Sequence, residues 1–341
     1  MGLAESAILD ISQGRRTGDL HPLSSLLGQV YHHLSSIKSN SGITGIPTFT
    51  DLDTLLSGLQ KSDLIILAAR PAMGKTSMAL NIAQNAAAKE GKTVAIFSLE
   101  MPKEQLVQRM LCTAAEVDHS RARRGMISKG DMKNLKEHQE HLMHAQVYID
   151  DTMSITVAEM RSKCRRLQRE HGLDLVLIDY IQLMQGNPGR RMESRQLEVA
   201  EISRALKAMA KELNVPVLAL SQLSRLAERS NEPPNLSHLR ESGALEQDAD
   251  VVLLLHRQRA EEGNRSEFSE EEQMKRGDRR GDQIDVIVAK HRNGPTGVAN
   301  LVFIKEFTAF RDHTDSWLGP RDIDAPPPKN TAEQDIILMP D

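Results

Sequence analysis

The segment Ala69–Thr76 reads A-R-P-A-M-G-K-T, and its spacing of glycine, lysine and threonine can bind the phosphates of a nucleotide. Gly74 lets the backbone approach an anion closely, Lys75 supplies a positive charge for the terminal phosphates, and the Thr76 hydroxyl can bind Mg²⁺. A G-K-T triplet also arises by chance, in a strand–turn–helix with an exposed lysine. The apolar run LIILAA before the segment and the helical run SMALNIAQNAAAKE after it favour the nucleotide site. We therefore predict that ATP and Mg²⁺ bind here, the ATP contacts being made by Ala69, Arg70, Pro71, Ala72, Met73, Gly74, Lys75, Thr76 and Ser77.

Three further polar side chains follow other apolar runs. Asp179 ends LVLID, Glu100 follows TVAIFSL, and Gln222 follows VPVLALS. Because the carboxyl ends of parallel strands meet at one edge of a sheet, we expect these side chains to lie beside the phosphates. We predict that Asp179 and Thr76 hold Mg²⁺, that Glu100 activates the attacking water, and that Gln222 senses the γ-phosphate. The simpler alternatives are a turn cap at Asp179, a surface position for Glu100 and a polar strand end at Gln222.

The elements that must position these side chains can be read from the alternation of strand-like and helical stretches between about Leu64 and Glu306. Continuous apolar strands with helices between them indicate a sheet that is covered on both faces. The clearest helix covers 193–213, and the last strands have no helices between them, so we predict an antiparallel extension. The predicted fold class is α/β, with a mostly parallel central sheet flanked by helices. The predicted strands are 64–69, 93–99, 147–150, 175–181, 215–221, 250–256, 284–290 and 298–306.

Three regions differ in composition. Residues 1–44 hold two amphipathic segments within 3–38 and a polar, Gly-rich linker; we predict that this region docks on a neighbouring subunit, the alternative being its own globular body. Residues 45–311 are predicted to form the ATPase domain, in which the charged run 257–282 is a solvated loop. Residues 312–341 have no periodicity and are predicted to be disordered.

The composition excludes several classes of protein. No apolar run is long enough to span a bilayer, and the N-terminus has no secretory signal. The two cysteines, Cys112 and Cys164, cannot form a disulfide framework or a zinc site, so a cytoplasmic location is expected. The net charge of −4 excludes a uniformly basic coat for nucleic acid, and 3% aromatic residues disfavour a binder that depends on base stacking.

Together, these motifs resemble the C-terminal motor domain of bacterial replicative DNA helicases of the DnaB family, which has a RecA-like ATPase fold. The resemblance covers about Gly45 to Phe310, and residues 3–38 resemble the family's linker helix. Ala69 replaces the first glycine of the general P-loop pattern, and alanine is usual there in this family. We expect the family's separate N-terminal helical domain to be absent. The stretches that carry the resemblance are ARPAMGKTS, FSLEMP, LVLIDYIQLM, LALSQLSR, LRESGALEQDADVV and AKHRNGPTG.

The resemblance implies a homo-hexameric ring that moves along single-stranded DNA and unwinds duplex at the replication fork, with ATP bound between subunits. Asn293-Gly294 is a hairpin signal between two apolar strands, with Lys290 and Arg292 beside it. By resemblance, these two cations reach into the neighbouring subunit's site and stabilise charge on the transferred phosphoryl group. The alternative is a basic hairpin in solvent.

LRESGALEQDAD is the candidate DNA loop. By resemblance, Arg240, Glu241 and Gly243 grip the DNA backbone inside the ring, a mode that reads no base sequence. The alternative is a helix start capped by Ser242, and both can hold together. A second and weaker candidate loop is NPGRRMESR, with Arg190, Arg191 and Arg195.

Other proteins with a similar core remain possible at this point. They are a RecA-like recombinase, a RecA-like ATPase without a DNA role, and an ATP-binding scaffold that assembles but does not move. The EMPKEQL and RESGALEQDAD stretches favour the helicase. The family further implies a helicase loader and a primase as partners, with primase docking mainly on the separate N-terminal domain.

Overall fold

The structure, a computed structural model of the chain, describes residues 22–36, 43–186, 194–224, 233–257 and 281–313. The chain divides into two units, residues 1–44 and 45–341. In the first unit, helix α2 (Leu23–Ser36) confirms the second predicted amphipathic segment. The first segment, most of the 257–282 loop and the tail beyond His313 lie outside the described residues.

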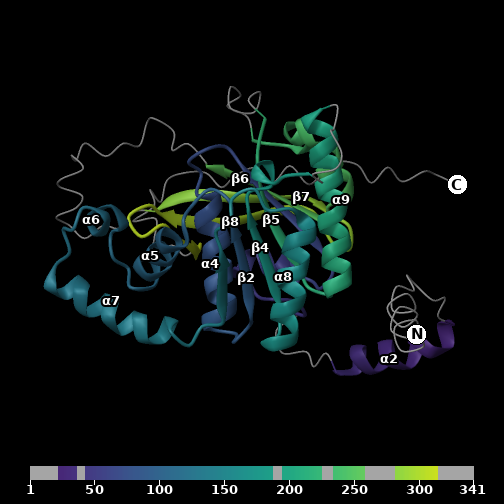
Figure 1. The fold of residues 1–341 in the computed structure, drawn as a ribbon, viewed down its shortest axis with the longest axis horizontal. Helices are drawn as coiled ribbons and strands as arrows, with labels where there is room; N and C mark the ends of the chain where they lie inside the picture. Colours follow the sequence, from purple (N-terminus) through teal and green to yellow (C-terminus); the bar gives the residue numbers. More distant parts are fainter. Residues whose placement is uncertain (1–21, 37–42, 187–193, 225–232, 258–280, 314–341) are drawn as a thin grey trace, which may run out of the picture. The chain divides into compact units, whose positions relative to one another are not determined.

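The second unit is built on a nine-stranded sheet with the order β3-β2-β4-β5-β1-β6-β7-β8-β9 (Figure 1). The strands from β3 to β6 in this order are parallel, and β7, β8 and β9 extend the sheet in antiparallel fashion, as predicted. Each predicted strand is present, and only the four-residue β9 was missed. The strands are β1 (Leu64–Ala69), β2 (Val94–Ser98), β3 (Val147–Asp150), β4 (Leu175–Asp179), β5 (Val217–Gln222), β6 (Val251–Arg257), β7 (Asp282–His291), β8 (Gly297–Ile304) and β9 (Ala309–Asp312).

Helices cover both faces of the sheet, because the strands are apolar on both sides. In β1, Ile65 and Leu67 pack with residues of α3, α4 and α5, whereas Leu64 and Ile66 pack with α8, α9 and α11. The described part of the unit also holds two short 3-10 helices, η1 and η2. The bounds are α3 (Thr50–Leu56), α4 (Lys75–Ala88), α5 (Lys103–Ala114), α6 (His119–Arg123), α7 (Lys129–Leu142), α8 (Val157–Glu170), η1 (Ile181–Leu183), α9 (Arg195–Leu213), η2 (Leu236–Ser242) and α11 (Gly243–Asp248).

The helix starts follow local hydrogen-bonding rules. Thr156 and Glu159 form a reciprocal capping box at the start of α8, and Ser194 caps α9 by accepting a hydrogen bond from the backbone N–H of Leu197. The helix predicted over 193–213 is therefore confirmed, with its first turn set by a serine. None of the helices in the described part of the chain is long and apolar enough to cross a lipid bilayer.

The parallel topology places several strand ends at one edge of the sheet. Ala69 lies opposite Gln222, and Ser98 lies opposite Asp179. The antiparallel β7 ends at the other edge, since its last residue, His291, pairs with the first residue of β6, Val251. We call these the carboxyl edge and the amino edge of the parallel strands.

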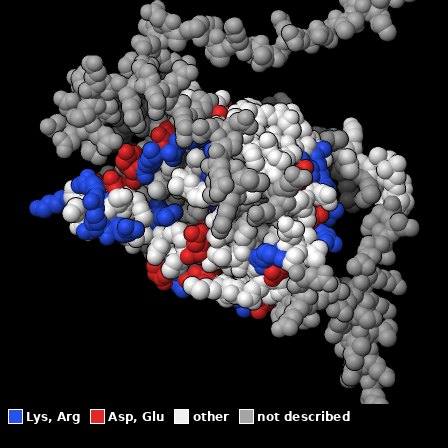
Figure 2. All heavy atoms as spheres, turned by 90° about the horizontal axis from the view of Figure 1, so that it is seen from above, with Lys and Arg blue, Asp and Glu red and all other residues white. Residues whose placement is uncertain are grey.

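Basic side chains do not cover this unit evenly. In Figure 2, Lys and Arg gather at the end formed by α6 and the start of α7, and the rest of the visible face mixes both signs of charge. Arg121 and Arg123 lie in the last turn of α6, and Arg124 follows it. A local basic patch thus exists despite the negative net charge.

Candidate active site

The predicted phosphate-binding segment joins β1 to α4 at the carboxyl edge. Gly74 is the residue before α4 and has a φ of +82°, a conformation that side chains disfavour. A Cβ at Gly74 would also lie 3.1 Å from Phe310 and 3.2 Å from Phe303. The segment borders a cavity of about 350 Å³, which is lined by Ala69, Arg70, Pro71, Ala72, Met73, Gly74, Lys75, Thr76, Ser77, Glu100, Arg109, Gln222 and Phe303. All nine predicted ATP-contacting residues therefore share one cavity.

Asp179 and Thr76 meet as the metal prediction requires. The Thr76 hydroxyl donates a hydrogen bond of 2.8 Å to Asp179 Oδ2. The Asp179 side chain is buried, and its Oδ1 atom has no hydrogen-bond partner among the described residues. Burial raises the pKa of Asp179, while Lys75 and the Thr76 hydroxyl act in the opposite direction. A buried carboxylate oxygen without a partner and a neighbouring hydroxyl are oxygen ligands of the kind that Mg²⁺ prefers.

Lys75 is held close to this acidic group. Its Nζ atom lies 4.7 Å from the centroid of the Tyr180 ring, a cation–π contact. Burial lowers the pKa of Lys75, and the carboxylates of Asp179 and Glu100 oppose that change. An anionic phosphate in the cavity would restore the electrostatic support that burial removes from this ammonium.

Glu100 and Gln222 reach the same cavity from two strands, β2 and β5, that lie on either side of β4. Glu100 is exposed in the connection between β2 and α5, and Gln222 is the last residue of β5. The backbone N–H of Gln222 donates to Gln182 Oε1 at 3.4 Å. The structure thus brings Glu100 and Gln222 together with the P-loop, although their catalytic roles remain predictions.

Lys290 and Arg292 lie at the opposite, amino edge of the sheet. Lys290 Nζ donates to the backbone oxygens of Glu246 and Gln247 at the end of α11, and the Arg292 guanidinium donates to the Gln247 oxygen. Arg292 Nη1 also lies 3.7 Å from Asp250 Oδ1. Neither cation is brought to the P-loop cavity of its own chain.

The candidate DNA loop is folded into two short helical elements. Arg240 and Glu241 belong to η2, and their side chains lie outside the described part. Gly243 begins α11 with helical backbone angles, and a Cβ there would meet no atom within 4 Å. The backbone conformation at Gly243 is thus open to any residue, and the predicted contact of Gly243 with DNA stays a prediction.

The second candidate loop is only partly described. Arg190 and Arg191 lie outside the described residues. Arg195 is the first residue of α9, and its Nη2 atom donates to the backbone oxygens of Gln182 and Met184 at 2.9 and 3.0 Å. Arg195 therefore fixes the segment after β4 instead of projecting freely.

The sequence was also compared with known protein families. The family described as "DnaB-like helicase C terminal domain" matches residues 45–312. The chain belongs to this family.

Individual relatives of the DnaB-like domain agree with the match. The chain is 48% identical to "Replicative DNA helicase DnaB" of Geobacillus stearothermophilus over 90% of its length, and 46% identical to "Replicative DNA helicase DnaC" of Bacillus subtilis (strain 168) over 90%. It spans 65% of the length of each relative.

Two solved structures are similar to the DnaB-like domain. One, described as an ATPase domain, is 36% identical, with a TM-score of 0.74 over 87% of this chain and 100% of that one. The other, a DnaB-like replicative helicase described with its interactions with primase, is 36% identical, with a TM-score of 0.74 over 86% of this chain and 69% of that one. These likenesses confirm the predicted RecA-like fold class.

One cation of the DnaB-like domain's cavity was missed in the sequence. Arg109 of α5 lines the cavity, and its Nε atom is buried without a hydrogen-bond partner in the described part of the chain. Burial lowers the pKa of Arg109, while Asp179 and Glu100 oppose this. The available signal was its position between Leu106 and Met110, because three-and-four spacing places all three on the inner side of one helix.

Proposed function

We propose that this chain is the ATP-driven motor of a replicative DNA helicase, a homo-hexameric ring that moves along single-stranded DNA and unwinds duplex at the fork. The proposal rests on the separation of the catalytic groups between the two edges of the sheet, together with the family. The similar full-length proteins are named replicative DNA helicases. A cytoplasmic location accompanies this role.

ATP would bind with its phosphates on the N–H groups at the start of α4. Thr76 and Asp179 would hold Mg²⁺, which when bound supplies positive charge to the terminal phosphates. Lys75 and Arg109 line the same cavity and would neutralise charge on the transferred phosphoryl group. Glu100 would accept a proton from the attacking water, and Gln222 would bond the γ-phosphate.

The position of Arg292 supports a role in a second copy of the chain. In the β1–β6 pair, Ala69 lies opposite Leu255, whereas the β7 residue nearest Arg292 pairs with Val251. Four residues of strand correspond to about 13 Å, and the sheet core lies between the two edges. Lys290 and Arg292 are therefore too far from the cavity of their own chain, and we propose that they serve the site of a neighbouring subunit in a ring with head-to-tail contacts.

The candidate DNA loop is connected to both edges. Lys290 and Arg292 bind the last carbonyls of α11, which follows η2. The backbone N–H of Ser224, two residues after Gln222, donates to the His238 oxygen in η2 at 3.0 Å. A change at either nucleotide-contacting group can thus move Arg240, Glu241 and Gly243 against DNA. Because this grip is mostly with phosphates, DNA affinity should fall with salt.

The partner proposals concern the ring and its assembly. Helix α2 exposes Leu23, Leu27, Val30 and Tyr31, and this apolar stripe suits docking of residues 1–44 on a neighbouring motor domain. A loader and a primase are the further partners of the proposed replicative role. Primase is described with the similar solved helicase.

Mixing two inactive variants tests the shared site. Glu100→Gln and Arg292→Ala chains should each hydrolyse almost no ATP. When the two variants are mixed before assembly, an intact Glu100 meets an intact Arg292 at about a quarter of the subunit interfaces. The turnover of the mixture should therefore exceed that of either variant alone. Mass measurement should show hexamers, and a forked duplex should be unwound by the wild-type chain.

The matched control mixes Glu100→Gln with Lys75→Ala. Lys75 and Glu100 belong to the same subunit of each interface, so no combination of the two variants gives an intact site. Turnover of this mixture should stay low. Failure of the first pair to recover activity, despite confirmed co-assembly, would show that Arg292 does not act in a neighbour. Strand exchange without unwinding would instead favour a recombinase.

A further inference from the structure

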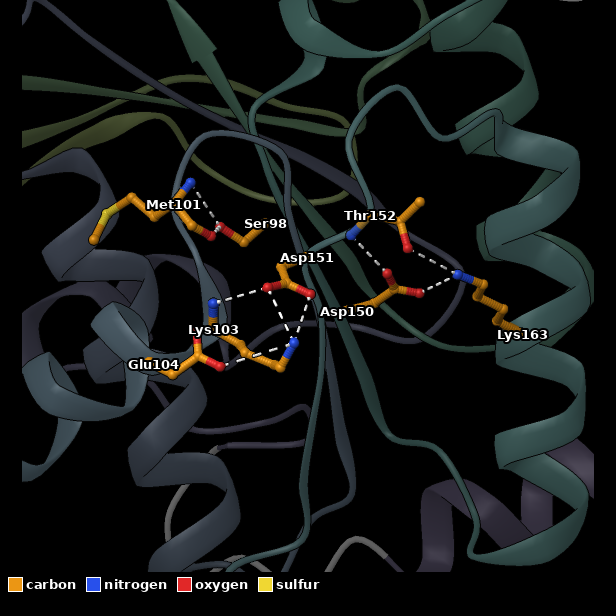
Figure 3. Close-up of polar contacts among 8 residues, drawn as sticks. All are labelled: Ser98, Met101, Lys103, Glu104, Asp150, Asp151, Thr152 and Lys163. Atoms are coloured by element: carbon orange, nitrogen blue, oxygen red, sulfur yellow. Dashed lines mark hydrogen bonds and ion pairs between the residues drawn. The ribbon is translucent and has the colours of Figure 1, made fainter.

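The connection that carries Glu100 is closed by a buried serine. The Ser98 hydroxyl donates to the Met101 oxygen at 2.7 Å and accepts the Met101 N–H at 3.2 Å (Figure 3). Ser98 is only 1% exposed. The backbone N–H of Leu99 is also fixed, because it donates a 2.7 Å hydrogen bond to the backbone oxygen of Asp179. The residues on both sides of Glu100 are therefore held, one of them by the strand that carries the proposed metal ligand.

The first turn of α5 is stabilised by Asp151, the residue that follows β3. Pro102 precedes α5 and provides no side-chain cap. Instead, Asp151 Oδ2 accepts the Lys103 backbone N–H at 3.2 Å, and the Asp151 carboxylate pairs with Lys103 Nζ at 3.2 Å. A carboxylate at this place stabilises the positive end of a helix.

Asp151 is itself supported from α8. Asp150 pairs with Lys163 of α8, and it accepts the Thr152 N–H at 2.9 Å. Lys163 Nζ also reaches the Thr152 hydroxyl at 3.3 Å. Figure 3 shows these contacts in two groups, one between Asp151 and α5 and one between Asp150, Thr152 and α8, which the backbone at the end of β3 joins. The turn after β3 thus connects a helix of one sheet face with a helix of the other.

These contacts bear on catalysis because they hold the backbone on which Glu100 stands. Among the described residues, the Glu100 carboxylate makes no hydrogen bond, so its position depends on the backbone between Ser98 and Lys103. Arg109 follows on the helix whose start Asp151 fixes. A displacement of about 1 Å at a reacting group can cost about 10²-fold in rate.

We propose that Ser98 and Asp151 are positioning residues for ATP hydrolysis. Ser98 fixes the turn that presents Glu100, and Asp151 fixes the start of α5, so that Glu100 and Arg109 face the same phosphate. The inference rests on the proposed function, since it assigns these contacts to the reaction at the P-loop cavity.

Ser98→Ala and Asp151→Ala in the full chain test the inference. With single-stranded DNA present, kcat for ATP should fall about 10- to 100-fold, while nucleotide affinity, measured by titration with a fluorescent ATP analogue, stays within about 2-fold. Asp151→Asn retains an oxygen that can accept the Lys103 N–H and should recover most of the rate. Lys103→Met removes only the ion pair and should stay near wild type, as should Glu104→Gln.

A double-mutant cycle separates positioning from general stability. In a Glu100→Gln background, Ser98→Ala should lower the residual turnover by less than about 2-fold, because the group it positions is gone. An unchanged kcat in both single variants, or an equal loss with and without Glu100, would overturn the inference. Thermal unfolding shows whether Ser98→Ala lowers the rate only because the variant misfolds. In that case the Asp151→Ala variant tests the inference, because Asp151 is partly exposed and its loss should disturb folding less.

Different results would reject the proposed function and the positioning role. If the wild-type chain hydrolyses no ATP, or if Glu100→Gln keeps full turnover, the assignment of the active site is wrong, and the positioning role is wrong with it. Normal wild-type turnover that depends on Glu100 but not on Ser98 or Asp151 rejects the positioning role alone.

Discussion

The carboxyl edge and the amino edge of the sheet differ in whether their buried charged groups, Asp179 and Arg109 at one and Asp250 at the other, find partners within the chain. At the carboxyl edge, Asp179 Oδ1 and Arg109 Nε are buried without hydrogen-bond partners in the described part of the chain. At the amino edge, Asp250 accepts the Leu64 N–H at 2.8 Å and pairs with Lys207, which also donates to the Ser62 oxygen at 2.8 Å. The carboxyl edge leaves Asp179 Oδ1 and Arg109 Nε available for a ligand. At the amino edge, Asp250 and Lys207 are paired within the fold, although Asp248 Oδ2 beside them is also buried without a partner in the described part.

The difference indicates where stability and where activity reside. Unsatisfied buried groups cost free energy, so the carboxyl edge is costly unless a ligand, such as the proposed nucleotide and metal, satisfies them. At the amino edge, breaking the buried pair of Asp250 and Lys207 should cost folding free energy, and Asp250 also contacts Arg292. Substitutions at the carboxyl edge should therefore lower catalysis, and substitutions of the paired groups at the amino edge should lower stability.

The largest effects are expected for two variants that remove a proposed catalytic cation, Lys75→Ala and Arg292→Ala. Arg292 is the residue of the amino edge whose loss should lower activity and not stability. ATP turnover should fall by about 10³-fold or more, as for other cations supplied by a neighbour, while nucleotide binding is retained. Lys75→Ala should abolish turnover and also weaken binding, since it acts at the cavity itself. Steady-state ATPase assays and equilibrium nucleotide titration distinguish the two. Weak binding by Arg292→Ala with normal turnover per bound ATP would reject the proposed role in a neighbour.

A smaller effect, on stability instead of catalysis, is expected for Lys207→Met. Removing this cation leaves the buried Asp250 and Asp63 without their lysine, and breaking such a pair costs about 3 kcal/mol. Urea unfolding measures the loss, and Lys211→Met on the exposed side of the same helix is the control. Equal stability of the two variants would mean that the amino edge is not the stabilising one.

The smallest effect is a pH dependence at Asp63. Burial, together with the nearby Asp250 carboxylate, raises the pKa of Asp63 above its usual value of 3.8. The folded state therefore holds this proton more tightly than the unfolded state, so the wild-type chain loses stability relative to Asp63→Asn as pH rises above about 4 through the folded pKa. Below that window the stability difference between the two chains should no longer change with pH. Unfolding free energies of both chains between pH 4 and 7 check this, and a difference that shrinks with rising pH would contradict it.

Much of the fold could be predicted because its strands are apolar on both faces and its helices are periodic. LIILAA could be identified as a strand without any tertiary information, and the start of α9 at Ser194 follows a capping rule. The four residues of β9 carry too little pattern to be recognised, since their pairing with β8 supplies the stabilisation. Arg109 was missed for a related reason. A cation within an amphipathic helix resembles a solvated residue until the helix packs against the site.

The sequence by itself determined the strand ends and the residue types on them: lysine and threonine after β1, a carboxylate after β2 and at the end of β4, an amide at the end of β5. It also determined the hairpin that bears Lys290 and Arg292. Only the tertiary structure decided that the first group converges on one cavity while the two cations lie at the far edge, bound to α11. Residue types and local periodicity are written along the chain, but distances between strand ends depend on strand order and direction, which long-range packing selects.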